Sequence, residues 1–150
     1  MARSLSRIGK ILALSLVASV VVGALAPSAE AKLLRREQML QLMNDKRVTR
    51  DVGRLDLSLR LTRIARAHSR EMAAEGEIFH TASLSRTLSY ATWTVAGENV
   101  GAGGGVDSLF EAFMSSAPHR RNILRKGFEH VGIGMVKSGD FLWVTMIFYG

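Results

Sequence analysis

Apolar residues recur at helical spacing in two segments of the chain, residues 34–47 and residues 57–75. Each segment places its apolar residues at intervals of three and four, and neither contains Gly or Pro. Asp56 or Ser58 is placed to cap the start of the second segment, and Gly76 is placed to end it. The pattern therefore predicts two amphipathic helices, each with one side in a hydrophobic core.

The C-terminal third of the chain has the alternation of a β-hairpin. Residues 131–136 alternate, residues 138–140 (Ser-Gly-Asp) form a turn, and residues 141–149 are apolar on both faces of an extended strand. A strand that is apolar on both faces belongs in a sheet covered on both sides. Because helices come first and strands mainly last, we expect an α+β fold, a three-layer α-β-α sandwich around a central antiparallel sheet.

The middle of the chain is less regular. Residues 77–92 show no sustained period, which indicates a loop, and this loop carries His80. Residues 93–100 resemble a strand that leaves through the glycine-rich residues 101–105. No internal repeat and no second domain is apparent, so we predict one domain.

A third helix is predicted over residues 107–116. Asp107 is a good N-cap, and Pro118 interrupts the helix just before His119. This helix places Ser116 three residues before His119.

The first 31 residues have the pattern of an export signal. A positively charged start precedes an apolar run over residues 11–26, and Pro27 and a small-x-small motif ending at Ala31 follow. The alternative, an uncleaved membrane anchor, needs about 20 apolar residues, more than this run provides. We therefore predict cleavage after Ala31, which leaves 119 residues beginning at Lys32 and no stable membrane anchor.

Cysteine content bears on how the fold is stabilised, and net charge bears on which partners the protein can bind. The chain has no cysteine, so packing alone must stabilise an exported fold. Its net charge is +7, and loss of three positive residues and Glu30 with the signal leaves +5. This balance favours anionic surroundings. The positive residues are scattered along the sequence and not interleaved with aromatic residues, so we expect no nucleic-acid partner.

Two histidines and one glutamate are the strongest candidates for chemistry. Glu98 lies among small residues, and His80 and His119 lie on segments that a compact fold can bring to it. Imidazole nitrogens and a carboxylate suit a metal site or proton transfer. A Ser116–His119 nucleophilic pair is a weaker alternative, because no third orienting group is evident. We expect a backbone-bonding role for Asn99, as for Arg120 and Asn122, a core or boundary position for His68 and a surface position for His130.

Five motifs in the same order are similar to those of the CAP superfamily (cysteine-rich secretory proteins, antigen 5 and pathogenesis-related 1) in its short bacterial form. The resemblance spans residues 36–149. The motifs are Asn44-Asp45-Lys46-Arg47 at the end of the first helix, His68-Ser69-Arg70-Glu71-Met72 running on to Gly76 and His80, Gly97-Glu98-Asn99, His119-Arg120-Arg121-Asn122-Ile123-Leu124, and Val131-Gly132-Ile133-Gly134 followed by Trp143-Val144-Thr145.

The resemblance implies the α-β-α sandwich and a cleft with two His and two Glu that holds a divalent metal in some members. His80, Glu98 and His119 match three of the four cleft residues. The second Glu of larger members follows a Trp by three residues; here Phe113 stands in the Trp position, so Ser116 stands in the Glu position. The cleft would thus contain His80, Glu98, Asn99, Ser116 and His119, with Zn²⁺ on His80 and His119 and Glu98 as third ligand or base.

The sequence supports three functional hypotheses. The first is an exported monomeric binding module, periplasmic or secreted, whose cleft recognises an envelope component, a lipid or a protein. The second is a metal-assisted hydrolase in which Glu98 is the general base. The third is a structural envelope protein without cleft chemistry. In the first two, Glu98 either orients an imidazole or takes a proton.

Overall fold

A computed structural model of the protein describes the backbone of residues 29–150 and the side chains from residue 34 onward. The export signal predicted over residues 1–31 lies almost entirely outside the described residues. The elements in chain order are α1 (Ala29–Val48), β1 (Asp56–Leu57), α2 (Leu59–Glu75), α3 (Leu84–Thr87), β2 (Ala96–Gly103), α4 (Val106–Ser115), α5 (Ala117–Ile123), β3 (His130–Ser138) and β4 (Phe141–Tyr149). In the part of the chain that is described, no helix is both long enough and apolar enough to cross a membrane.

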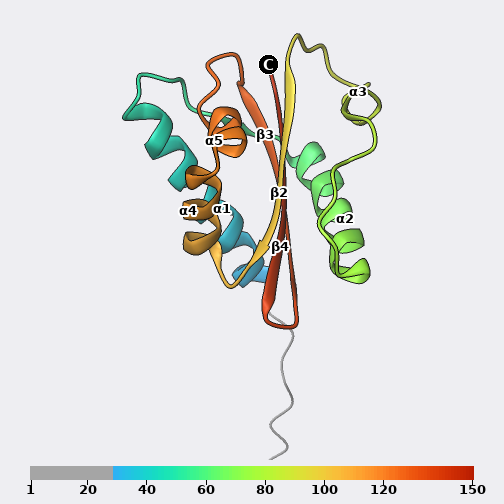
Figure 1. Ribbon diagram of the computed structural model, residues 1–150. Helices are drawn as coiled ribbons and strands as arrows, with labels where there is room; N and C mark the ends of the chain where they lie inside the picture. The colour runs from blue at the N-terminus through green and yellow to red at the C-terminus, as the bar shows by residue number, and fades with distance from the viewer. Residues whose placement is uncertain (1–28) are drawn as a thin grey trace, which may run out of the picture.

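The molecule is a three-layer sandwich, as predicted. Helices α1, α4 and α5 cover one face of the sheet, and α2 and α3 cover the other (Figure 1). The strand order is β1-β3-β4-β2. Strands β2, β3 and β4 are antiparallel as expected, whereas the two-residue β1 pairs parallel with β3, so the complete sheet is mixed.

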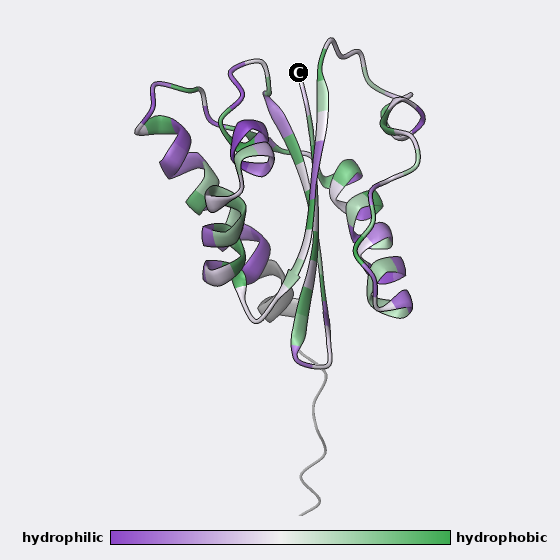
Figure 2. Ribbon diagram, viewed as in Figure 1, coloured by the Kyte–Doolittle hydropathy of each residue, from purple (hydrophilic) through white to green (hydrophobic). Residues whose placement is uncertain are grey.

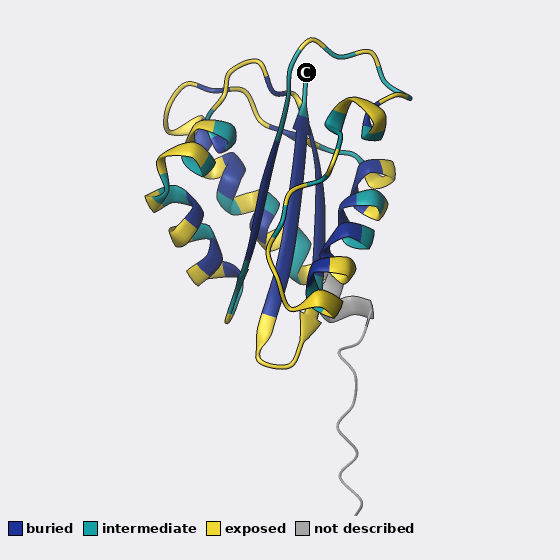
Figure 3. Cartoon of the chain, turned by 45° about the vertical axis from the view of Figure 1, so that its right-hand side comes forward, coloured by how far each residue is buried: buried dark blue, intermediate teal, exposed yellow. Residues whose placement is uncertain are grey.

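The apolar two-sided strand occupies the centre of this sheet. Met146 and Phe148 of β4 face the large core under α1, α4 and α5, and Trp143 and Ile147 face the smaller cores under α2. The strands are buried along most of their length, while the outward sides of the helices are exposed (Figure 3). Hydrophilic residues recur along the helices of both outer layers (Figure 2).

The predicted caps of α2 are partly confirmed. The Ser58 hydroxyl accepts from the Leu61 backbone N–H at 3.2 Å, and Gly76 ends the helix in the left-handed conformation at φ 70°. Asp56 is not a cap: it lies in β1, paired with His130. A strand of two residues has no detectable alternation in the sequence. The sequence pattern therefore could not exclude Asp56 as the cap.

Three boundaries in the middle of the chain differ from the prediction. Strand β2 continues through the glycine-rich segment to Gly103, because β4 pairs with it along its whole length. Helix α4 begins at Val106 with Gly105 as N-cap, and Asp107 lies inside the first turn, where it accepts a bond from Gln38. Pro118 does not merely end a helix; it lies in the first turn of α5, where a missing N–H costs nothing.

Candidate functional site

Strand β2 is an edge strand, and its two faces carry different parts of the site. A Cβ on Gly97 would lie 2.8 Å from Phe128 Cζ and 3.1 Å from Asn122 Oδ1, so this face is in tight contact with the α5 side. Residues of a strand alternate between faces. Asn99 therefore shares the α5 side with Gly97, whereas Glu98 points to the α2 side.

The carboxylate of Glu98 is buried and accepts three hydrogen bonds. His80 Nδ1 lies 2.6 Å from Oε2, and the Thr81 backbone N–H donates to the same oxygen at 3.0 Å. The Thr81 hydroxyl donates to Oε1. Only 4% of the Glu98 side chain is exposed. The carboxylate thus holds the loop before α3 against the edge strand.

His80 has one engaged and one free ring nitrogen. Since a carboxylate only accepts, Nδ1 is the donor, and Nε2 carries the lone pair when the ring is neutral. The side chain is 62% exposed. Phe79, the preceding residue, packs edge-on against His68 of α2, with ring centroids 5.1 Å apart. This contact anchors the backbone next to His80. His80 therefore presents Nε2 outward from an anchored backbone.

Asparagine side chains join β2 to α5 on the opposite face. Asn122 Nδ2 donates to the Glu98 carbonyl at 3.0 Å and to Asn99 Oδ1 at 2.9 Å. Asn99 Nδ2 donates to the His119 carbonyl at 3.1 Å. The backbone-bonding roles predicted for Asn99 and Asn122 are confirmed, and Arg120 likewise donates to the Met114 carbonyl at 2.7 Å.

His119 is half-buried at the start of α5 and close enough to His80 for their charges to oppose each other. Its ring packs edge-on against the ring of Phe113, with centroids 5.2 Å apart. Phe113, which stands where larger members have a Trp, therefore helps to fix the orientation of His119. Burial lowers the pKa of His119, and repulsion from His80 lowers it further. The two imidazoles approach from opposite sides of the edge strand β2.

Ser116 lies at the junction of α4 and α5 and makes no capping bond with its side chain. Its backbone carbonyl accepts from the Arg120 N–H at 2.9 Å, but no hydrogen bond joins its hydroxyl to the His119 ring among the described residues. The arrangement offers nothing in favour of a Ser–His nucleophilic pair.

The donor set does not form a three-ligand metal centre. No group of three or more His, Cys, Asp or Glu lies close enough to hold an ion in residues 29–150. Glu98 is directed at His80 Nδ1 and Thr81 instead of outward. The residues available to an ion are the two imidazoles, one fewer than the three protein ligands of catalytic zinc sites.

Two further histidines lie outside this site. His68 is buried, as predicted, with Nδ1 3.1 Å from Thr145 Oγ1. His130 is half-buried, not a surface residue, because its ring packs on Tyr149 at 4.7 Å within the sheet. Sequence reasoning missed Thr81, because its segment is rich in Ser, Thr and Ala and has no pattern that singles it out.

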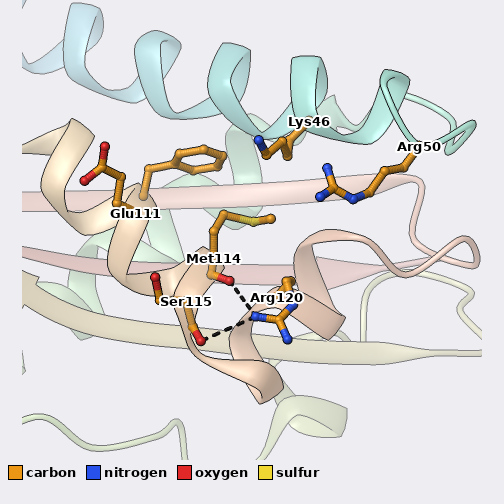
Figure 4. Close-up of a pocket in the computed structure, with 7 residues that line it drawn as sticks. Lys46, Arg50, Glu111, Met114, Ser115 and Arg120 are labelled. Atoms are coloured by element: carbon orange, nitrogen blue, oxygen red, sulfur yellow. Dashed lines mark hydrogen bonds between the residues drawn. The ribbon is translucent and has the colours of Figure 1, made fainter.

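A separate pocket of about 570 Å³ lies between α1, α4 and α5. The residues that line it are Lys46, Arg50, Phe110, Glu111, Met114, Ser115 and Arg120 (Figure 4). Lys46 lies in the last turn of α1, Arg50 lies in the turn that follows this helix, and Arg120 lies in α5. His80, Glu98 and His119 do not line this pocket.

Comparison with known proteins places the sequence and the fold in one group. A family profile described as CAP, cysteine-rich secretory protein family, matches residues 40–148. The uncharacterized protein YkwD of Bacillus subtilis (strain 168) is 32% identical over 124 residues, which cover 76% of this chain and 46% of YkwD. The chain thus spans about half the length of this relative.

Solved structures agree on the fold. An extracellular protein containing an SCP domain from Bacillus anthracis has a TM-score of 0.75 at 22% identity, covering 85% of this chain and 44% of that one. An outer surface protein from Borrelia burgdorferi has a TM-score of 0.69 at 14% identity, covering 75% and 90%. From the family match and the shared α-β-α sandwich, we conclude that the chain belongs to the CAP family and is a CAP domain of the bacterial type.

Proposed function

We propose that this CAP domain is exported and acts as a binding module, with its ligand contacting His80 and His119 at the open edge of β2. The observation that carries the proposal is the bonding of Glu98. Three donors engage its carboxylate, and the side chain is almost fully buried. Such a group orients an imidazole instead of exchanging protons with a substrate.

The same observation weighs against the hydrolase alternative. A general base must reach the proton that it abstracts, and Glu98 has little surface from which to do so. A catalytic zinc needs three protein ligands and an open position. The described residues offer two imidazoles, so no feature of the site favours hydrolysis over binding.

In this proposal the two imidazoles are the protein ligands of a divalent ion. Bound there, it would supply Lewis acidity and positive charge to a ligand group. The part of this chain is to present His80 Nε2 through the Glu98 bond to Nδ1 and to lower the pKa of His119 by burial, which favours its neutral ring. A carboxylate behind a metal-binding histidine raises the basicity of the ring and fixes its orientation.

Zn²⁺ titration by calorimetry tests whether the two histidines bind the same ion. Binding should be lost in His80→Ala and in His119→Ala separately, and Glu98→Gln should weaken it about 10–100-fold. The control is His130→Ala, which should leave binding unchanged because His130 packs on Tyr149 elsewhere in the sheet. Binding that survives either cleft substitution would contradict a shared site.

Export is the second part of the proposal. The charged start, apolar run and cleavage motif of residues 1–31 support it, and the similar Bacillus anthracis protein is described as extracellular. N-terminal sequencing of protein recovered outside the cytoplasm should begin at Lys32. Recovery of the intact chain from the cytoplasm would contradict export.

A further inference from the structure

Four arginines lie on the outward side of α2, on a part of the surface that the His80–His119 site does not use. They are Arg60, Arg63, Arg66 and Arg70. At about 100° per residue, these positions fall within one third of the helix circumference. The buried residues Leu61, Ala65 and Met72 lie on the opposite side. Although the positive residues are scattered along the sequence, α2 therefore gathers four of them into a stripe, which we call the arginine stripe.

The arginine stripe has no counter-charge before its C-terminal end, where the exposed Glu71 falls about 20° from Arg60 around the helix. Helix α2 has no acidic residue in its first turn, and its first acidic residue is Glu71. None of the four arginines forms an ion pair within the described part of the chain. Arg60, Arg63 and Arg70 are exposed, whereas Arg66 is half-buried and its Nε is buried without a hydrogen-bond partner. Exposed residues recur along α2 in Figure 3.

This charge arrangement opposes the stability of the helix. Arg63–Arg66 and Arg66–Arg70 are like-charge neighbours at i,i+3 and i,i+4, each costing about 0.2–0.5 kcal/mol. Arg60 lies near the positive end of the helix dipole, and Glu75 lies at the negative end, so both are placed unfavourably. A helix face that needed only solubility would alternate the signs of its charges. The stripe therefore indicates an anionic partner.

The shape of the stripe favours a linear partner. With a rise of 1.5 Å per residue, Arg60 and Arg70 lie about 15 Å apart along the axis. Guanidinium groups bind phosphate oxygens through two parallel hydrogen bonds. The Arg60 guanidinium is held 3.8 Å above the ring of Tyr90, which limits the freedom lost on binding. Leu59 is the one large apolar side chain of α2 that is mostly exposed within the described residues, so the face offers little for insertion into a bilayer.

We propose that the arginine stripe binds a linear polyol-phosphate polymer along α2, because the helix carries no Phe, Tyr or Trp on which nucleobases could stack. The interaction rests on backbone phosphates and does not involve the two cleft histidines. This inference is therefore independent of the function proposed for the His80–His119 site.

Binding of poly(glycerol phosphate) to the purified protein tests this inference. Arg63→Gln/Arg70→Gln should weaken binding at least about tenfold at 50 mM salt. If all four arginines contact phosphates, the slope of log K against log salt should be about −3, and it should fall to about half in this variant. The control, Arg50→Gln/Lys126→Gln, removes the same charge from exposed residues outside α2 and should bind nearly as well as the unmodified protein.

Three outcomes would overturn the inference. One is absence of binding by the unmodified protein. Another is an equal loss in the control variant, which would show that net charge alone is responsible. The third is tighter binding to phosphatidylglycerol vesicles than to the polymer, with the same loss in the α2 variant, which would identify a membrane surface instead. Thermal unfolding of both variants confirms that each remains folded.

Discussion

Replacement of Arg47 by Met should destabilise the protein more than any change at an exposed arginine. Arg47 is fully buried at the end of α1, and no carboxylate pairs with it in the described residues. Its guanidinium donates instead to four carbonyls, those of Gly53 at 2.6 Å, Ile123 at 2.9 Å, Arg125 at 3.0 Å and Phe128 at 2.7 Å. One side chain thus ties α1 to the end of α5 and to the segment before β3.

The expected loss of unfolding free energy depends on two opposing contributions, the hydrogen bonds of the guanidinium and the cost of burying its charge. Hydrogen bonds from a charged donor contribute about 1.5–3 kcal/mol each. Burial of the cation offsets much of this sum, and the same desolvation lowers the pKa of Arg47. Met removes the donors and leaves four carbonyls without them, at about 1–3 kcal/mol for each acceptor left unsatisfied. The desolvation cost of the guanidinium is removed at the same time, so we expect a net loss of about 3–5 kcal/mol. Arg47→Lys should lose nearly as much, because a point charge cannot match the planar fork.

Urea denaturation followed by circular dichroism measures this loss. Arg50→Met is the matched control, since Arg50 is exposed, and it should stay within about 0.5 kcal/mol of the unmodified protein. A loss below about 1 kcal/mol for Arg47→Met would refute the reasoning. Because Ile123 ends the helix that begins beside His119, the same variant should also shift the NMR signals of His119.

Further predictions concern β2 and the cleft histidines. Gly97→Ala should cost about 1–3 kcal/mol, because its Cβ would clash with the buried ring of Phe128, whereas Gly104→Ala, with no atom within 4 Å, should be tolerated in the same urea assay. The pKa of His119 lies below 6.5 in the folded protein, so the native chain binds fewer protons than the unfolded chain as pH falls past about 6.5. Stability should therefore fall with acidification through that region, less steeply in His119→Gln, and equal slopes would contradict the shift. NMR titration of His80→Gln should show a higher pKa for His119 that still lies below 6.5, because burial remains.

The long periodic segments could be predicted because each buries one continuous side. Helices α1 and α2 and the β3–β4 hairpin follow from residue spacing alone, and so does the three-layer order. The short elements β1, α3 and α5 could not be predicted, since two to seven residues do not establish a period. Their positions depend on contacts with residues far along the chain.

Local pattern identified the candidate residues but not the contacts that they make. His80, Glu98 and His119 were all candidates, yet the choice between base and orienting residue for Glu98 depends on Thr81, which lies 17 residues away and has no distinguishing sequence context. Arg47 is a similar case. The nearby cations Lys46 and Arg50 are half-buried and exposed, so the sequence does not single out Arg47 as buried. Its four carbonyl partners become visible only when α1, α5 and the segment before β3 are assembled.

The central claim is that Glu98 orients His80 so that its Nε2 and the ring of His119 face one ligand. ¹⁵N NMR of the imidazole nitrogens during a Zn²⁺ titration tests it most directly. We predict that His80 carries its proton on Nδ1 when neutral, and that the signals of His80 and His119 move together while those of His68 and His130 stay fixed. A proton on His80 Nε2, or signals of only one of the two histidines moving, would contradict the account.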